Sequence, residues 1–425
     1  SPARVRILAG AETAAHLRNV FGAKKSLFEI SPLYDEKGSV PGGDGQPALH
    51  FTATVPRDRL DELDDPRYGL RWELAVPLRE AQTLVEVEEV GRFGTAERNA
   101  EQMLAREVLD PPAHPPRFLG SGRVGRKGEA VVAVVDYGAP FLHVNFQDGK
   151  GRTRIRALWD QDRRFMRSWW AAPPRAGYGR ELSAAAIQAM LKSNRDAARR
   201  QRFDEAVVYR SLDYLIAYRD PRRRVYNATH GAHVLDMAGG QRDPLVAPPA
   251  QPKPPARNLV FVQLPAMTAA DSSGGSLGAQ LLDAVRYVLD VCHLDTKVVV
   301  NISYGSAAGS HDGSSLTESA LDELLERRGK NFAIVLAAGN SRRTDTHAHR
   351  VASPERSARL RLALEPGDST DTFVELWYPQ PKPYAPVLGV RVRTPQRDWS
   401  DWVRPGEEVA LLNERGEVTA LLQHR

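Results

Sequence analysis

The chain changes from a loop to a helix in the stretch NATHGAHVLDMAGG, residues 227–240. His230 stands at the expected start of this helix, and small residues follow it. A helix start holds a side chain in fixed geometry, and histidine is the side chain that most readily exchanges a proton near neutral pH. His230 is therefore a candidate general base. A His-Gly pair at a helix start is also common as a purely structural feature, so the other segments of the chain must decide.

Two apolar segments, one on each side of this helix, end on polar residues that suit catalysis. Residues 130–136, AVVAVVD, predict a buried strand of a parallel sheet that ends on Asp136. Residues 332–341, FAIVLAAGNS, predict a second such strand that leads to Asn340. Open α/β sheets place their sites at the carboxyl ends of strands, where an Asn amide can donate to a developing oxyanion. Each residue taken alone also fits a simple turn or cap.

In this order the three motifs resemble those of the subtilisin-like serine proteases, the subtilases. A fourth segment fits as well: VNISYG at residues 300–305 resembles the strand that lines the main specificity pocket in that family. The resemblance covers about residues 115–345. It implies that Asp136 orients His230, that His230 acts as the general base, and that Asn340 stabilises the oxyanion.

The resemblance also predicts how substrate binds. A peptide or protein substrate would lie as an extended strand against Ser303, Tyr304 and Gly305. One departure lies inside the motifs, because the family's usual Thr two residues after the catalytic His is Ala232 here. We expect little effect from the lost hydroxyl group. The implied chemistry needs no cofactor and no metal, and we expect neither.

The family's nucleophile has no counterpart in the sequence. In the family it is a Ser in a Gly-Thr-Ser-x-Ala-type motif at a helix start, well after the Asn. The serines after Asn340 are Ser341, Ser353, Ser357, Ser369 and Ser400. None is flanked by Gly and small residues and followed by a helical pattern. A Ser-His-Asp site without its Ser cannot form an acyl-enzyme. Either the chain continues beyond the 425 residues, or the nucleophile lies on a separate chain, or the protein is not a protease.

The composition is that of a globular protein with a large core. The 425 residues exceed one average domain, and 42% are hydrophobic and 26% charged. No apolar run approaches the ~18 residues of a membrane-spanning helix, and the N-terminus lacks the apolar core of a signal peptide. The single cysteine, Cys292, excludes an internal disulfide and follows the apolar end of a predicted helix, which predicts a packed thiol. These features slightly favour a cytoplasmic location.

Positive charge is concentrated in residues 150–224, which hold 19 Lys and Arg against 8 Asp and Glu, whereas the whole chain has a net charge of +5. Aromatic residues are interleaved with these charges: Trp159, Trp169, Trp170, Tyr178, Tyr209, Tyr214 and Tyr218. Such a surface can attract an acidic protein, lipid headgroups or nucleic acid. A solvated helical face with its aromatic side chains turned inward explains the same pattern. We favour the second explanation, keep an acidic partner open and do not expect nucleic acid.

Residues 1–112 precede the resemblance to subtilases. Residues 49–55 and 84–90 alternate like strands, and residues 96–109 have helical spacing. This pattern predicts a small α+β domain. Many subtilases carry at this position a folding helper that inhibits the enzyme until it is removed.

The remainder of the chain predicts two further domains. Strands and helices alternate over residues 113–350, which predicts a doubly wound parallel sheet, incomplete relative to the family. The excess length at about 150–224 predicts a basic helical insertion, with a helix over 182–218. Residues 351–425 show several strand-period runs separated by turn residues, which predicts a β-sandwich similar to the jelly-roll insertion of some bacterial subtilases.

Three functions follow from these features. The favoured one is a subtilisin-like endopeptidase whose nucleophilic Ser lies outside the 425 residues. The second is a catalytically inactive relative that binds a peptide or a partner protein. The third, a nucleic-acid-binding protein, would use the basic face of residues 150–224.

Overall fold

The structure is a computed structural model. It describes residues 4–23, 27–35, 37–75, 122–162, 170–171, 173, 175–198, 205, 208–209, 212, 214, 229–241, 257–265, 268, 275–353, 355–364, 372–378, 388–393, 399–416 and 418–424. The chain divides into two compact units, Ser1–Asn340 and Ser341–Arg425. None of the helices in these described ranges is both long enough and apolar enough to cross a membrane.

The first unit is built around a six-stranded sheet in the order β10-β9-β5-β8-β6-β7. Its strands are β5 (Ala130–Asp136), β6 (Ile155–Asp160), β7 (Arg180–Ser183), β8 (Asn258–Gln263), β9 (Lys297–Ile302) and β10 (Phe332–Leu336). All neighbours pair in parallel except β6 and β7, which are antiparallel. The predicted parallel-dominated α/β sheet is confirmed.

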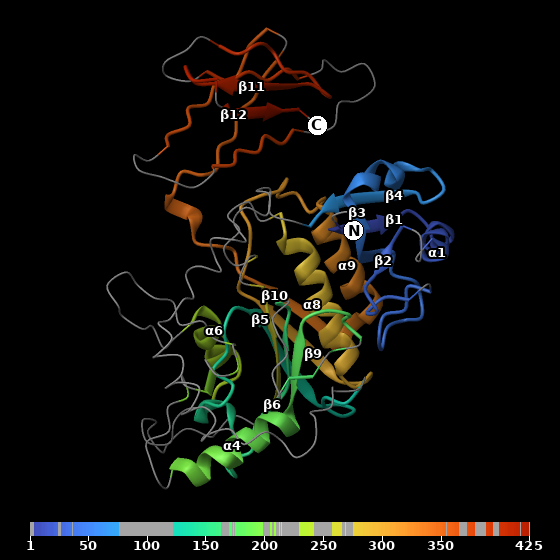
Figure 1. Cartoon of the computed structure of the whole chain (residues 1–425), viewed down its shortest axis with the longest axis vertical. Helices are drawn as coiled ribbons and strands as arrows, with labels where there is room; N and C mark the ends of the chain where they lie inside the picture. The colour runs from blue at the N-terminus through green and yellow to red at the C-terminus, as the bar shows by residue number, and fades with distance from the viewer. Residues whose placement is uncertain are drawn as a thin grey trace. The chain divides into compact units, whose positions relative to one another are not determined.

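Both faces of this sheet are covered, which explains why its strands are apolar on both sides. Three alternate residues of β5, Val131, Ala133 and Val135, belong to the core that includes α8 (Leu277–Val291) and α9 (Leu316–Arg328). The intervening residue Val134 belongs to a second core, on the face covered by α4 (Ala184–Ala198) and α6 (His230–Gly239). Figure 1 shows α8 and α9 on one side of the sheet and α4 and α6 on the other.

A second, antiparallel sheet lies on the outer side of α8 and α9. Its order is β2-β3-β1-β4, and Figure 1 shows it beside these two helices. The strands are β1 (Arg4–Ala11), β2 (Glu29–Ile30), β3 (His50–Pro56) and β4 (Leu70–Leu74), and α1 (Ala14–Gly22) follows β1. The strand predicted at 49–55 is confirmed as β3. The strand predicted at 84–90 and the helix predicted at 96–109 lie outside the described residues.

Short 3₁₀ helices complete the elements of the described ranges. They are η1 (Arg57–Asp64), η2 (Val144–Phe146), η3 (Gly329–Asn331) and η4 (Ser341–Arg343).

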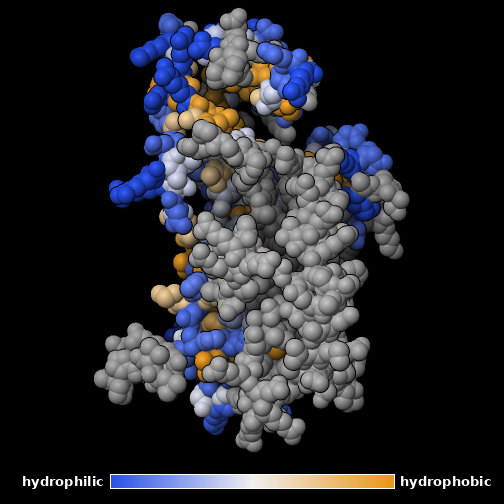
Figure 2. Space-filling view, turned by 60° about the vertical axis from the view of Figure 1, so that its left-hand side comes forward, coloured by the Kyte–Doolittle hydropathy of each residue, from blue (hydrophilic) through white to orange (hydrophobic). Residues whose placement is uncertain are grey.

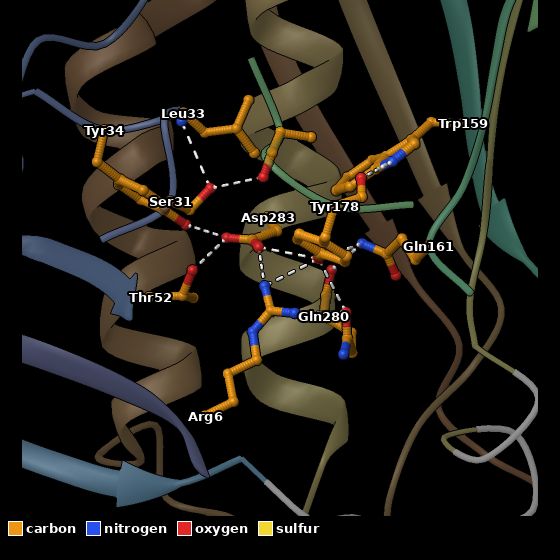
Figure 3. Close-up of polar contacts among 11 residues, drawn as sticks. Arg6, Ser31, Leu33, Tyr34, Thr52, Trp159, Gln161, Tyr178, Gln280 and Asp283 are labelled. Carbon is orange, nitrogen blue, oxygen red and sulfur yellow. Dashed lines mark hydrogen bonds and ion pairs between the residues drawn. The ribbon is translucent and has the colours of Figure 1, made fainter. Parts of the chain in front are cut away.

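A buried carboxylate on α8 anchors the N-terminal sheet (Figure 3). Asp283 is fully buried and forms an ion pair with Arg6 of β1. Its Oδ1 accepts hydrogen bonds from the hydroxyl groups of Tyr34, at 2.6 Å, and Thr52, at 2.7 Å. Its Oδ2 accepts from the hydroxyl group of Tyr178, at 2.9 Å. Because a buried charge is costly unless it is paired and hydrogen-bonded, these contacts tie the N-terminal sheet to α8.

The helix α9 is one of the helices that the alternation of strands and helices over residues 113–350 predicts. Ser315 caps it and forms a capping box with Glu318, and the last turn is basic, as the helix dipole favours. Cys292 is fully buried after α8, as predicted, and burial raises the pKa of its thiol to about 12.

The helix predicted over 182–218 is wrong at its start. Leu182 belongs to β7, and α4 begins two residues later at Ala184. The strand forms because Arg180 pairs with a buried carboxylate on β6 and Leu182 is itself buried, so tertiary contacts override the helical spacing.

The second unit contains, among its described residues, an antiparallel hairpin of β11 (Glu408–Leu412) with β12 (Val418–Gln423). Single bridges join Val390 to Val403 and Arg393 to Trp399. Many of its large apolar side chains are exposed, and hydrophobic atoms lie open at the surface in the upper part of Figure 2. The hairpin agrees with the predicted strand period, whereas the complete β-sandwich stays a prediction.

Candidate active site

The structure brings Asp136 and His230 together. Asp136 is the last residue of β5, and His230 is the first residue of α6. The ring nitrogen Nδ1 of His230 lies 2.8 Å from Oδ1 and 3.0 Å from Oδ2 of Asp136. An ionised carboxylate only accepts, so Nδ1 carries the proton in this bond. The carboxylate is fully buried and the ring is 60% exposed, which leaves the far edge of the ring open to solvent.

Burial raises the pKa of the Asp136 carboxyl group above its ordinary value. The hydrogen bond from His230 and the bond from the backbone N–H of Tyr137, at 2.7 Å, act in the opposite direction and only partly offset burial. The site therefore holds a carboxylate in an environment that disfavours its charge, as is typical of functional sites.

Close backbone contact fixes where α6 begins. The N–H of Gly231 donates to the carbonyl oxygen of Tyr137 at 2.9 Å, and the hydroxyl group of Thr229 donates to the carbonyl oxygen of Gly138 at 2.7 Å. A Cβ atom on Gly231 would lie only 2.6 Å from that carbonyl oxygen of Gly138. Only glycine therefore allows the residue after His230 to approach the loop after Asp136.

The insertion supports the same loop. The hydroxyl group of Tyr214 accepts from the N–H of Ala139 at 3.2 Å, and the hydroxyl group of Tyr209 accepts from the N–H of Leu142 at 3.0 Å. Both tyrosines are buried, as are Trp159 and Trp170, and the positions predicted at Trp169 and Tyr218 lie outside the described residues. These buried aromatic rings are unavailable for stacking on bases, which agrees with the inward-facing explanation.

A row of buried polar residues beside Asp136 was not predicted from the sequence. Gln263 of β8 is in register with Asp136 on one side and with Asp160 of β6 on the other, and Asp160 is in register with Arg180 of β7. All four side chains are fully buried. The available signal was that β5, β6 and β8 each end on a polar residue after an apolar run.

The other predicted site residues lie at the same edge of the sheet. Ser303, Tyr304 and Gly305 follow β9 directly, and Asn340 lies in an exposed turn after β10. Since β10 pairs with β9 and β9 with β5, parallel pairing puts all three carboxyl ends at one edge. Ser303 also accepts a hydrogen bond from the Asn301 amide at 2.9 Å.

Two of the serines after Asn340 have local hydrogen-bond partners. The hydroxyl group of Ser353 donates to Glu355 at 2.9 Å, and that of Ser400 donates to the carbonyl oxygen of Asp401 at 2.8 Å. Ser369 lies outside the described residues. Within the described ranges, no group of three or more His, Cys, Asp or Glu side chains is placed to hold a metal ion.

A solved structure, the CspB protease of Clostridium perfringens, is similar with 22% sequence identity and a TM-score of 0.35, over 52% of this chain and 38% of that chain. The chain thus spans less than half the length of that protease. No curated protein sequence matches the chain. The model of the subtilase family, peptidase S8, matches residues 127–365, more than half of the chain. The chain belongs to the subtilase family.

Proposed function

We propose that the chain is the Asp-His part of a subtilisin-like serine endopeptidase, whose nucleophilic Ser is supplied by residues outside the 425. The observation that carries the proposal is the hydrogen bond between Nδ1 of His230 and the buried carboxylate of Asp136. Family membership supports the same reaction class.

In the proposed mechanism Asp136 holds the ring of His230 with the proton on Nδ1. The other ring nitrogen, Nε2, then has a free lone pair and takes the proton from the Ser hydroxyl group as that oxygen attacks the peptide carbonyl carbon. His230 returns the proton to the leaving amine, and a water molecule repeats the sequence to release the acyl group. The 60% exposure of the ring supports this role because substrate and nucleophile must reach it from solvent.

Asn340 is the proposed oxyanion donor, and Ser303, Tyr304 and Gly305 are the proposed substrate-binding residues. The turn that carries Asn340 is exposed, so its amide is available to a substrate. Residues 303–305 extend from β9, where a peptide in extended conformation can pair with the backbone.

The outer edge of β10 supports a nucleophile from elsewhere. Val335 and Leu336 are 51% and 59% exposed although they belong to the central sheet. Successive strand residues face opposite sides, so both sides of this strand end are uncovered by the described residues. β10 is also the end strand of the sheet order among the described residues, and an exposed apolar end strand can pair with a further strand. We infer that the segment that carries the Ser covers this edge.

A fluorophosphonate probe tests the proposal, since it reacts only with an activated Ser hydroxyl group. The 425 residues alone should remain unlabelled, and a chain extended by the natural continuation of its reading frame should be labelled.

A second candidate is a catalytically inactive relative that binds a peptide or protein through residues 303–305. The absence of a Gly-Thr-Ser-x-Ala-type motif from the 425 residues favours it. The two candidates differ in one result: an extended chain that binds peptide and never reacts with the probe supports the second.

For the N-terminal sheet we propose the role of a folding helper for the catalytic unit. Its contacts with α8 through Asp283 and with α9 through Glu323 support this role.

A further inference from the structure

We propose that the buried row Arg180–Asp160–Gln263 is a positioning device for the Asp136–His230 pair. The inference rests on the proposed function and names residues that act on the pair through its loop, without touching substrate.

The row is continuous in hydrogen bonds. Nε of Arg180 donates to Oδ2 of Asp160 at 2.9 Å, and Nε2 of Gln263 donates to Oδ1 of Asp160 at 3.4 Å. Oε1 of Gln263 accepts from the backbone N–H of Gly138 at 3.2 Å. The chain of bonds therefore begins on β7 and ends two residues after Asp136.

The ion pair fixes the orientation of the Gln263 amide. An ionised Asp160 only accepts, so the NH₂ group of Gln263 must face it and the amide oxygen must face Gly138. A reversed amide would place two donors, its NH₂ group and the N–H of Gly138, against each other. Arg180 pairs with Asp160 and holds its carboxylate in place, and is itself held by the carbonyl oxygen of Leu212 at 3.2 Å and by the ring of Trp170, 4.2 Å away.

Gly138 connects the buried row to the segment that carries His230. Its carbonyl oxygen accepts from the hydroxyl group of Thr229, the residue immediately before His230. The N–H of Gly138 is thus bonded to Gln263 of β8, and its carbonyl oxygen is bonded to Thr229 at the start of α6. The loop has other contacts, among them the bonds to Gly231 and Tyr214, so loss of the Gln263 bond loosens the loop at Gly138 and, with it, the relative placement of Asp136 and His230.

A buried polar row of this kind adds little to the free energy of unfolding compared with well-packed apolar residues. Replacing a buried ion pair with apolar residues is often neutral or stabilising, whereas a satisfied buried network favours one geometry over others. If the row fixes the placement of Asp136 relative to His230, its loss should change the tautomer of His230 most directly. The hydrogen bond to Asp136 requires the proton on Nδ1.

The test is the fraction of His230 protonated on Nδ1, measured from imidazole ¹⁵N chemical shifts in the 425-residue chain at a pH where the ring is neutral. His230→Gln assigns the resonances. We expect mostly the Nδ1 tautomer in the wild type and a several-fold larger share of the Nε2 tautomer in Gln263→Met, which removes both bonds. Gln263→Asn keeps an amide that is one methylene too short to bridge Asp160 and Gly138, and should shift the tautomer in the same direction if Gln263→Met does not fold.

Thr52→Val is the matched control, because it removes one equally buried hydrogen bond, to Asp283, on the other side of α8. It should leave the tautomer unchanged. Folded Gln263 variants with the wild-type tautomer would overturn the proposal. A shifted tautomer would uphold it even if no extended chain ever reacts with a fluorophosphonate, so its failure and the failure of the proposed function are separate results.

Discussion

Nδ1 of His230 lies 2.8 Å from Oδ1 of Asp136, although 94 positions separate the two residues in the sequence. The carboxylate is fully buried and the ring is largely exposed. Burying the charge of Asp136 lowers the free energy of unfolding, and this loss can be measured.

Asp136→Asn should raise the free energy of unfolding at pH 7 relative to the wild type. Burial raises the pKa of Asp136, so the folded state binds its proton more tightly than the unfolded state does, and this group's contribution to stability falls as pH rises through the raised pKa. An Asn removes the cost of burying the charge. The gain should shrink as pH falls toward the ordinary pKa of an Asp, about 4, where the wild-type carboxyl group becomes protonated. Urea unfolding of the wild type and of Asp136→Asn at several pH values measures this gain in the free energy of unfolding.

Asp148→Asn is the control, and its change in the free energy of unfolding should have the opposite sign. Burial acts to raise the pKa of Asp148, but hydrogen bonds from Arg152 and from the N–H of Lys150 outweigh it and lower the pKa. This variant should lose stability at pH 7 and approach the wild type in acid. A uniform loss for Asp136→Asn at every pH would contradict the burial argument.

Gly231→Ala should destabilise the first unit by about 1–3 kcal/mol, the usual cost of overpacking. The added Cβ would lie 2.6 Å from the carbonyl oxygen of Gly138, and backbone atoms cannot move aside as a flexible side chain does. Gly22→Ala introduces the same group in a helix with nothing within 4 Å and should change stability little. Equal effects of the two variants in urea unfolding would argue against close contact at α6.

Arg6→Met should cost about 3–5 kcal/mol, because it leaves the buried carboxylate of Asp283 without its cation. Adding Asp283→Asn to this variant should recover much of the loss, since the amide can still bond the hydroxyl groups of Tyr34 and Thr52. A double-mutant cycle with urea unfolding checks both values. A loss below about 1 kcal/mol in the single variant would mean that the N-terminal sheet does not depend on this pair.

Glu323→Gln should weaken the docking of β3 on α9 at neutral pH and have little effect in acid. Burial acts to raise the pKa of Glu323, but hydrogen bonds from the His50 ring, at 2.5 Å, and from the N–H of Leu49, at 2.9 Å, lower it. A lowered pKa gives stability that is present above the unfolded pKa and is lost as pH falls through the folded pKa. Amide hydrogen exchange in β3 measures the effect.

Glu326→Gln, an exposed position on the same helix, serves as the control. Its amide exchange profile should match that of the wild type at each pH. A pH-independent change in β3 for Glu323→Gln would show that the charge is not what holds the strand.

Local patterns in the sequence predicted the elements that are fully buried or that are stabilised by contacts between residues close in sequence. The strand β5 follows from its apolar run, and Asp136 and His230 follow from their places at element ends. β7 was missed because its strand depends on the Arg180–Asp160 pair, which sequence spacing does not reveal.

The two buried networks were missed for the same reason. Gln263 becomes a neighbour of Asp136 and Asp160 only through the register of three strands. Asp283 appears as an ordinary polar residue of a helix until the N-terminal sheet covers it. Contacts of this kind depend on tertiary arrangement, so periodicity carries no signal for them.

Fluorophosphonate labelling separates an active serine endopeptidase from an inactive relative. We expect that the 425-residue chain is not labelled, that a chain extended along its reading frame is labelled at a Ser in the added residues, and that His230→Ala in the extended chain abolishes labelling. Asn340→Ala in the same chain should lower peptidase turnover on the order of a hundredfold or more. Labelling of the 425 residues alone, or labelling of the extended chain that survives His230→Ala, would contradict this expectation.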